Sequence, residues 1–113
     1  MRKYSAAGEI ELARNKACEI ASSLLRSDEL YLDKILEMEA LGRLLYPEIW
    51  ATEFHVFGVI ASDTDHIPTS DVKRNFSKNW IERCDIELKE IATFYRKDVT
   101  LACQEVIAKH CSA

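Results

Sequence analysis

The sequence predicts an all-α protein, a small bundle in which three shorter helices pack on one long C-terminal helix. Only three Gly and two Pro occur among 113 residues, too few turn residues for a many-stranded β fold. Apolar side chains recur at intervals of three and four residues, the spacing that lines one face of an α-helix. With 48% apolar and 30% charged residues, the chain is expected to form one globular domain over residues 1–113.

The first half of the chain predicts two helices. Residues 1–8 are small and polar and are expected to fray. From Glu9 an apolar stripe follows in helical spacing, made of Ile10, Ala13, Ala17, Ile20, Ala21, Leu24 and Leu25. The pair Ser27-Asp28 is expected to end this helix and to cap the second one, whose apolar residues run from Leu30 to Leu44.

A third helix is expected over Glu48 to Ile60, after Pro47, which is favoured at the start of a helix. The stretch Val56 to Ile60 could by composition form a short strand. A lone strand would have no partner, because nothing else in the chain has a β pattern. The polar segment 61–70 and a short turn over Asp71 to Phe76 then lead to the last helix.

The chain is organised around its C-terminal stretch, which predicts one uninterrupted helix over Asn79 to His110. Its apolar stripe consists of Ile81, Cys84, Leu88, Ile91, Tyr95, Val99, Ala102 and Val106. Neither Gly nor Pro interrupts it, and Ser77 stands where an N-cap oxygen is needed. At about 1.5 Å per residue such a helix is about 45 Å long, so the other helices are expected to pack along it.

The chain is mildly acidic, with a net charge of −4 and no cluster of Lys and Arg. This pattern argues against a nucleic-acid-binding protein, which needs a basic surface. The most acidic stretch is the outer face of the second helix, which carries Asp28, Glu29, Asp33, Glu37 and Glu39. Such a face is either a solvated surface or a docking surface for a basic partner protein, and both interpretations stay open.

No run approaches the 18 apolar residues of a membrane helix, and the N-terminus lacks the apolar core of a signal peptide. A cytoplasmic protein without a membrane partner is therefore expected. Its four cysteines are Cys18, Cys84, Cys103 and Cys111, none of them in CxxC spacing. They are expected to be free, reduced thiols that behave as small hydrophobic side chains.

Asp63, Asp65 and His66 are the residues that most suggest a metal or acid–base site. Carboxylate and imidazole groups are suitable ligands for a divalent metal, but a centre needs three or four ligands, and the remaining candidates show no recognised spacing. Adjacent residues of an extended segment also point to opposite sides. No nucleophile elbow, phosphate loop or HExxH pattern occurs. The sequence therefore predicts a helix connector, with no catalysis, no metal and no cofactor.

Two motifs of the chain resemble those of a known family. The run Phe54 to Pro68 resembles a central motif that reads Phe-x-x-Phe-x-x-Ile-x-Ser-Glu-x-Asp-x-x-Pro, and Tyr95 to Cys103 is similar to a closing Tyr, Val and Cys. Both motifs are those of the DUF2489 domain, a family of small bacterial helical proteins, and the likeness extends more loosely over Ala13 to Leu45. The chain departs from the family's Glu, Gly, Arg and Trp at Asp63, Ser70, Lys73 and Phe76.

Members of such families are often immunity proteins of bacterial toxin systems, including contact-dependent growth inhibition. The resemblance thus implies a protein that binds a cognate toxin, in particular a nuclease effector, and occludes its active site without catalysis. A small acidic protein suits this function, because charge complementarity speeds association with a basic toxin. The acidic face of the second helix supplies the first contact candidates, and the loop from Asp63 through Asp65 to His66 supplies the second.

Two alternatives stay open beside the immunity function. A metal-dependent hydrolase centred on the loop 63–66 would carry bound metal when purified. A structural or regulatory homodimer would bury the apolar excess of Trp50, Phe54 and Phe57 between two chains.

Overall fold

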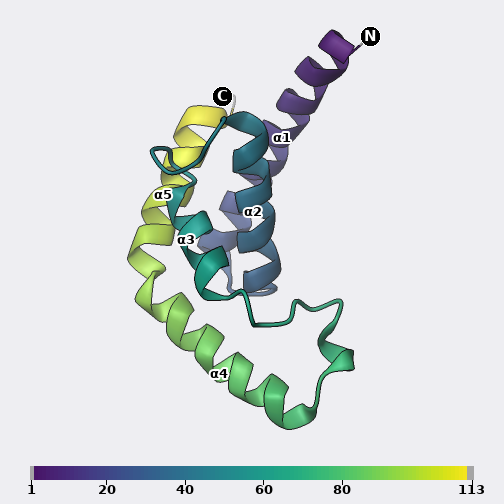
Figure 1. Ribbon diagram of the computed structural model, residues 1–113. Helices are drawn as coiled ribbons and strands as arrows, with labels where there is room; N and C mark the ends of the chain where they lie inside the picture. Colours follow the sequence, from purple (N-terminus) through teal and green to yellow (C-terminus); the bar gives the residue numbers. More distant parts are fainter. Residues whose placement is uncertain (1, 112–113) are drawn as a thin grey trace.

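The computed structural model describes residues 2–111 of the chain as a set of α-helices (Figure 1). They are α1 (Arg2–Arg26), α2 (Tyr31–Leu45), α3 (His55–Asp63), α4 (Lys78–Phe94) and α5 (Arg96–His110), with a short 3-10 turn, η1 (Lys73–Asn75), before α4. No strand occurs in the described range, so the all-α class predicted from the scarcity of Gly and Pro is confirmed. The segment Val56 to Ile60 lies within α3 and is helical, as predicted.

Helix α1 packs against both α2 and α5. Its buried stripe is the predicted one, Ala13, Ala17, Ile20, Ala21 and Leu24. Helix α1 begins at Arg2, earlier than the predicted start at Glu9, and its first turns extend beyond the bundle (Figure 1). Good helix formers, among them two alanines, an arginine and a lysine, favour this extension.

The turn between α1 and α2 differs from the expected one. Helix α1 ends before Ser27, as predicted, but Ser27-Asp28 does not cap α2. The N-cap residue is Leu30, which has a φ of 53° in the left-handed region and makes no side-chain capping bond. Ser27 Oγ instead accepts a hydrogen bond from the Glu29 amide inside the turn, at 2.9 Å. The serine therefore closes the turn, and a leucine carries the backbone strain.

The main core lies where α1, α2, α3 and α5 meet. Its largest fully buried side chains are Phe54, Phe57, Ile35, Met38, Ile49, Ile60, Val106 and Cys103. Phe54 and Phe57 are 0% exposed, so these two rings belong to the core of the chain itself and cannot form the interface of the homodimer considered above. Trp50 differs from them, because 46% of it is exposed.

The third helix begins later than predicted, at His55 instead of Glu48. Residues 46–54 form a series of turns that Thr52 organises: its hydroxyl donates to the Ile49 carbonyl at 2.7 Å and accepts from the Phe54 amide at 3.1 Å. Side chains of this type favour turns over helix, because they offer the backbone a local partner.

The predicted single helix over Asn79 to His110 is wrong, because Tyr95 divides it into α4 and α5, which meet at a corner (Figure 1). Tyr95 has φ −95° and ψ 6°, and its hydroxyl donates to Asp63 Oδ2 at 2.7 Å. Arg96, the next residue, pairs with Asp28 at 3.2 Å. The predicted cap of this segment is confirmed, since Ser77 Oγ accepts from the Trp80 amide at 3.2 Å.

Helix α4 packs on the bundle through a second apolar cluster. Its buried members are Leu32, Ile67 and Cys84, with Leu36, Trp80, Leu88 and Ile91 packed against them. The connector between α3 and α4 supplies Ile67 to this cluster, next to the buried Pro68. Within the described part of the chain, no helix is long and apolar enough to cross a bilayer.

Two of the four cysteines are not free, which corrects the expectation of four reduced thiols. Cys18 of α1 and Cys111, directly after α5, form a disulfide whose Cα atoms lie 5.8 Å apart. Cys84 and Cys103 are free and buried, as predicted. Burial raises the pKa of the Cys103 thiol to about 12, so this thiol stays protonated and unreactive at neutral pH.

Candidate functional site

A cleft of about 690 Å³ lies between α2, the turn before α3, α3 itself and the connector that leads to α4. Its lining includes Leu36, Glu39, Arg43, Trp50, Asp65, His66, Ile67 and Phe76. Two large aromatic side chains stand at this cleft half exposed, Trp50 at 46% and Phe76 at 45%. A volume of this size is within the range of sites that hold a small ligand or the side chains of a partner.

The first part of the connector is a rigid wall of the cleft. The buried Thr64 hydroxyl donates to the Ile60 carbonyl at 2.8 Å and ends α3, and the Ile67 amide donates to the Thr64 carbonyl at 2.9 Å. Because Ile67 and Pro68 are buried, the polar residues between them and Thr64 are directed outwards. This local geometry brings Asp65 and His66 to the cleft, where Glu39 of α2 also lies.

The three loop residues singled out from the sequence do not converge on one point. Asp63 accepts the Tyr95 hydroxyl at the corner of α4 and α5, and this hydrogen bond raises the pKa of Tyr95. His66 Nε2 bonds Glu87 Oε1 of α4 at 2.8 Å, whereas Asp65 lines the cleft. Among residues 2–111, no group of three His, Cys, Asp or Glu side chains is placed to hold a metal ion.

The five acidic residues around α2 are divided between several environments. Asp28 pairs with Arg96 at 3.2 Å, and Asp33 accepts hydrogen bonds from the Ser70 amide and hydroxyl. These two carboxylates therefore make exposed contacts to α5 and to the connector. Asp33 and Glu37 border a shallow groove next to α1, whereas Glu39 pairs with Arg43 at 3.0 Å and faces the cleft. Glu29 is exposed in the turn before α2. The five residues do not form one docking face.

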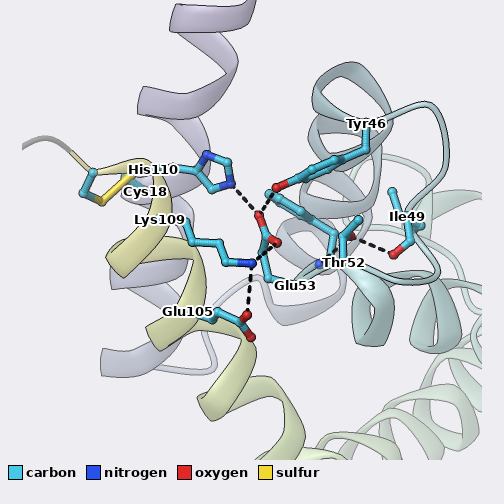
Figure 2. A network of polar contacts seen from close by, with 10 residues as sticks. Cys18, Tyr46, Ile49, Thr52, Glu53, Glu105, Lys109 and His110 are labelled. Atoms are coloured by element: carbon cyan, nitrogen blue, oxygen red, sulfur yellow. Dashed lines mark hydrogen bonds and ion pairs between the residues drawn. A yellow bond between two sulfur atoms is a disulfide. The ribbon is translucent and has the colours of Figure 1, made fainter.

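A buried polar network that was not predicted from the sequence joins the turn before α3 to the end of α5 (Figure 2). The Glu53 side chain is only 1% exposed. Its Oε2 accepts the Tyr46 hydroxyl at 2.7 Å and His110 Nε2 at 2.5 Å, and its Oε1 accepts Lys109 Nζ at 3.2 Å. The same ammonium reaches Glu105 at 3.2 Å. Because these residues are far apart in the chain, they form no local sequence motif from which the network could be predicted.

The donors around Glu53 keep its carboxyl group ionised. Burial alone would raise the pKa of Glu53, but the hydrogen bonds from Tyr46, His110, its own backbone amide and Lys109 outweigh burial and lower the pKa to about 2. Burial and the bond to Glu53 in turn raise the pKa of Tyr46, and the bonds to Glu105 and Glu53 raise that of Lys109.

Comparisons of the chain with protein-family models, with curated proteins and with solved structures gave no match. The Glu53 network is closed to solvent on the His110 side, whose ring is 5% exposed, so its chemistry is that of a structural anchor. The open cleft with Trp50 and Phe76 has the features of a binding surface.

Proposed function

We propose that this protein is an immunity protein, which binds a cognate bacterial toxin domain, in particular a nuclease effector, and blocks its active site without catalysis. The observation that carries the proposal is the cleft, because it places two half-exposed aromatic side chains beside Glu39 and Asp65. Exposed aromatic residues are common anchors of protein interfaces, and carboxylates beside them suit a basic toxin. The family resemblance of the motifs Phe54 to Pro68 and Tyr95 to Cys103 supports the same function.

The contribution of Trp50 to the binding free energy can be estimated from its exposed surface. With 46% of Trp50 exposed, a partner that covers it removes on the order of 100 Å² of mainly apolar surface from water. At about 25 cal/mol per Å² this burial contributes about 3 kcal/mol, roughly a hundredfold in affinity. Arg43 and Glu39 form a surface pair of the kind that contributes at most about 1 kcal/mol, so an arginine of the toxin can replace Arg43 at little cost.

The cellular compartment in which the protein is found provides a second test of the proposal. An immunity protein of this kind acts in the cytoplasm, where the toxin meets its target. A disulfide such as Cys18–Cys111 is characteristic of oxidising compartments and is rare in the cytosol. Cell fractionation, with thiol alkylation before lysis, is expected to find the protein in the cytoplasmic fraction. Exclusive recovery from an oxidising compartment would contradict this function.

The decisive experiment is co-expression with the reading frame directly upstream, followed by affinity capture and size-exclusion chromatography. We expect a stable complex and relief of the neighbour's toxicity only when this chain is present. Trp50→Ala should weaken the complex about a hundredfold, whereas Leu12→Ala, which alters a leucine that is 69% exposed on α1, should leave it unchanged. A harmless neighbour and a solitary monomer would refute the proposal.

A further inference from the structure

A separate groove of about 330 Å³ lies between α3 and α5 and shares no lining residue with the cleft. Its apolar part is formed by Val56 and Val59 of α3 with Leu101 and Ala102 of α5. Leu101 is 55% exposed, which leaves an apolar side chain in water without a partner in the described chain. The apolar part therefore offers contact area to a partner.

The α5 side of the groove alternates apolar and acidic side chains. This side is lined by Tyr95, the residue before α5, and by Asp98, Leu101, Ala102 and Glu105 of α5. Asp98 and Ala102 are four residues apart, as are Leu101 and Glu105, and this spacing places them on one side of the helix. The stripe covers about three helical turns, or roughly 15 Å, which matches the length of a short helix that lies along α5.

The groove is acidic. Glu53 lies at its base and Asp98 and Glu105 lie on α5, so three carboxylates are present. One ammonium group, that of Lys109, bridges Glu53 and Glu105 at 3.2 Å from each. Asp98 is exposed, and none of the ion pairs within residues 2–111 includes it. Lys109 shows that a basic side chain fits between these carboxylates, and the acidic charge left over selects a basic partner.

We propose that the groove between α3 and α5 binds a short amphipathic helix of another protein, with apolar side chains on one face and Lys or Arg beside them. Apolar side chains of that helix would cover Leu101, Val56 and Val59, and its cations would reach Asp98 and Glu105. A second copy of this chain fits less well, because the groove would bring carboxylates against carboxylates. This site is independent of the toxin contact at the cleft.

The test uses a labelled synthetic peptide of about 14 residues, with Leu at helical spacing and Lys on the flanks. Two control peptides are used. One carries the same residues in scrambled order, and the other carries Glu in place of each Lys. Fluorescence polarisation is expected to show saturable binding of the first peptide alone, weakened in about 0.5 M salt. Amide shifts in two-dimensional NMR are expected to map to α3 and α5.

Two variants with matched controls locate the contact. Leu101→Ser and Asp98→Lys should each weaken peptide binding about tenfold, whereas Leu12→Ser and Glu82→Lys, exposed on α1 and α4, should have no effect. Thermal melts of all four variants confirm that the fold is kept. Equal binding of the scrambled peptide, shifts that map to the cleft, or no saturable binding would overturn the proposal. A dimer of this chain broken by Asp98→Lys would also overturn it, because the occupant would be a second copy.

Discussion

Removal of the charge on Glu53 should abolish a large part of the acid sensitivity of the protein. In the folded state the pKa of Glu53 falls from its ordinary value of 4.5 to about 2, because Tyr46, His110 and Lys109 donate to the carboxylate and outweigh burial. At about 1.4 kcal/mol per pH unit, this difference corresponds to about 3 kcal/mol of stability. Since the folded pKa is the lower one, this contribution is fully present above pH 4.5 and is lost as the pH falls towards 2.

The assay is urea unfolding of wild type and Glu53→Gln, followed by circular dichroism at several pH values and constant ionic strength. We expect the variant to be less stable near neutral pH, because its neutral amide replaces a carboxylate that accepts three donors. Between about pH 5.5 and about pH 2, wild type should lose about 3 kcal/mol more than the variant does.

The matched control is Glu37→Gln, which alters an exposed carboxylate of α2. Its pH profile should run parallel to that of wild type. If Glu53→Gln also ran parallel to wild type, the carboxylate would not titrate at a lowered pKa, and the network around it would not hold the ion pair described above. A second readout is the two-dimensional NMR titration of the Glu53 side chain in wild type.

Three further predictions concern the backbone and the disulfide. Cys18→Ser removes the disulfide that links residues 93 positions apart and should lower the free energy of unfolding by about 4 to 5 kcal/mol. Urea unfolding of oxidised and reduced wild type, with the free thiols quantified, tests this. Equal stability of the two forms would contradict it. Gly42→Ala should destabilise the protein by about 1 to 3 kcal/mol in thermal melts, because the new Cβ would meet the buried Phe54 ring at 2.7 Å. The control Gly8→Ala, whose Cβ would meet nothing within 4 Å, should stabilise the protein by about 0.5 to 1 kcal/mol. Leu30→Gly relieves a φ of 53° and should raise the melting temperature slightly; a lower value would show that the leucine side chain matters more than the strain.

The helical class and most of the buried stripes could be predicted, because periodicity records which face of a segment meets the core. Periodicity does not record whether the axis continues straight. The stripe through Tyr95 keeps its helical spacing across the corner, so nothing in it announces the break. Two contacts from distant segments lie at the corner, Asp63 to Tyr95 and Asp28 to Arg96, and these exist only after the chain has folded.

The candidate site could be predicted only in part. Asp65 and His66 do line the cleft with Glu39, but Asp63 lies at the corner instead. Helix geometry explains the division of the acidic face, because residues two apart, such as Glu37 and Glu39, point to nearly opposite sides of a helix. The prediction counted acidic residues along the sequence without regard to the side of the helix on which each lies, and so it placed all five on one surface.

The contacts that could not be predicted also differ in kind between the two proposed binding surfaces. At the α3–α5 groove, α5 is tied to the rest of the bundle by a disulfide, by the buried Glu53–His110 contact and by the main core. These links are strong, because they are covalent or shielded from water.

The outer wall of the cleft is held in a different way. Beyond the buried Ile67 and Pro68, the connector rests on exposed polar contacts, among them Ser70 with Asp33 and Lys73 with Asp85. Exposed pairs of this kind contribute about 0 to 1 kcal/mol each. A partner that covers Trp50 gains more than such a pair does, so it can shift the outer connector and still bind. We therefore infer that the groove is preformed for one shape of ligand, whereas the outer wall of the cleft can adapt to a partner.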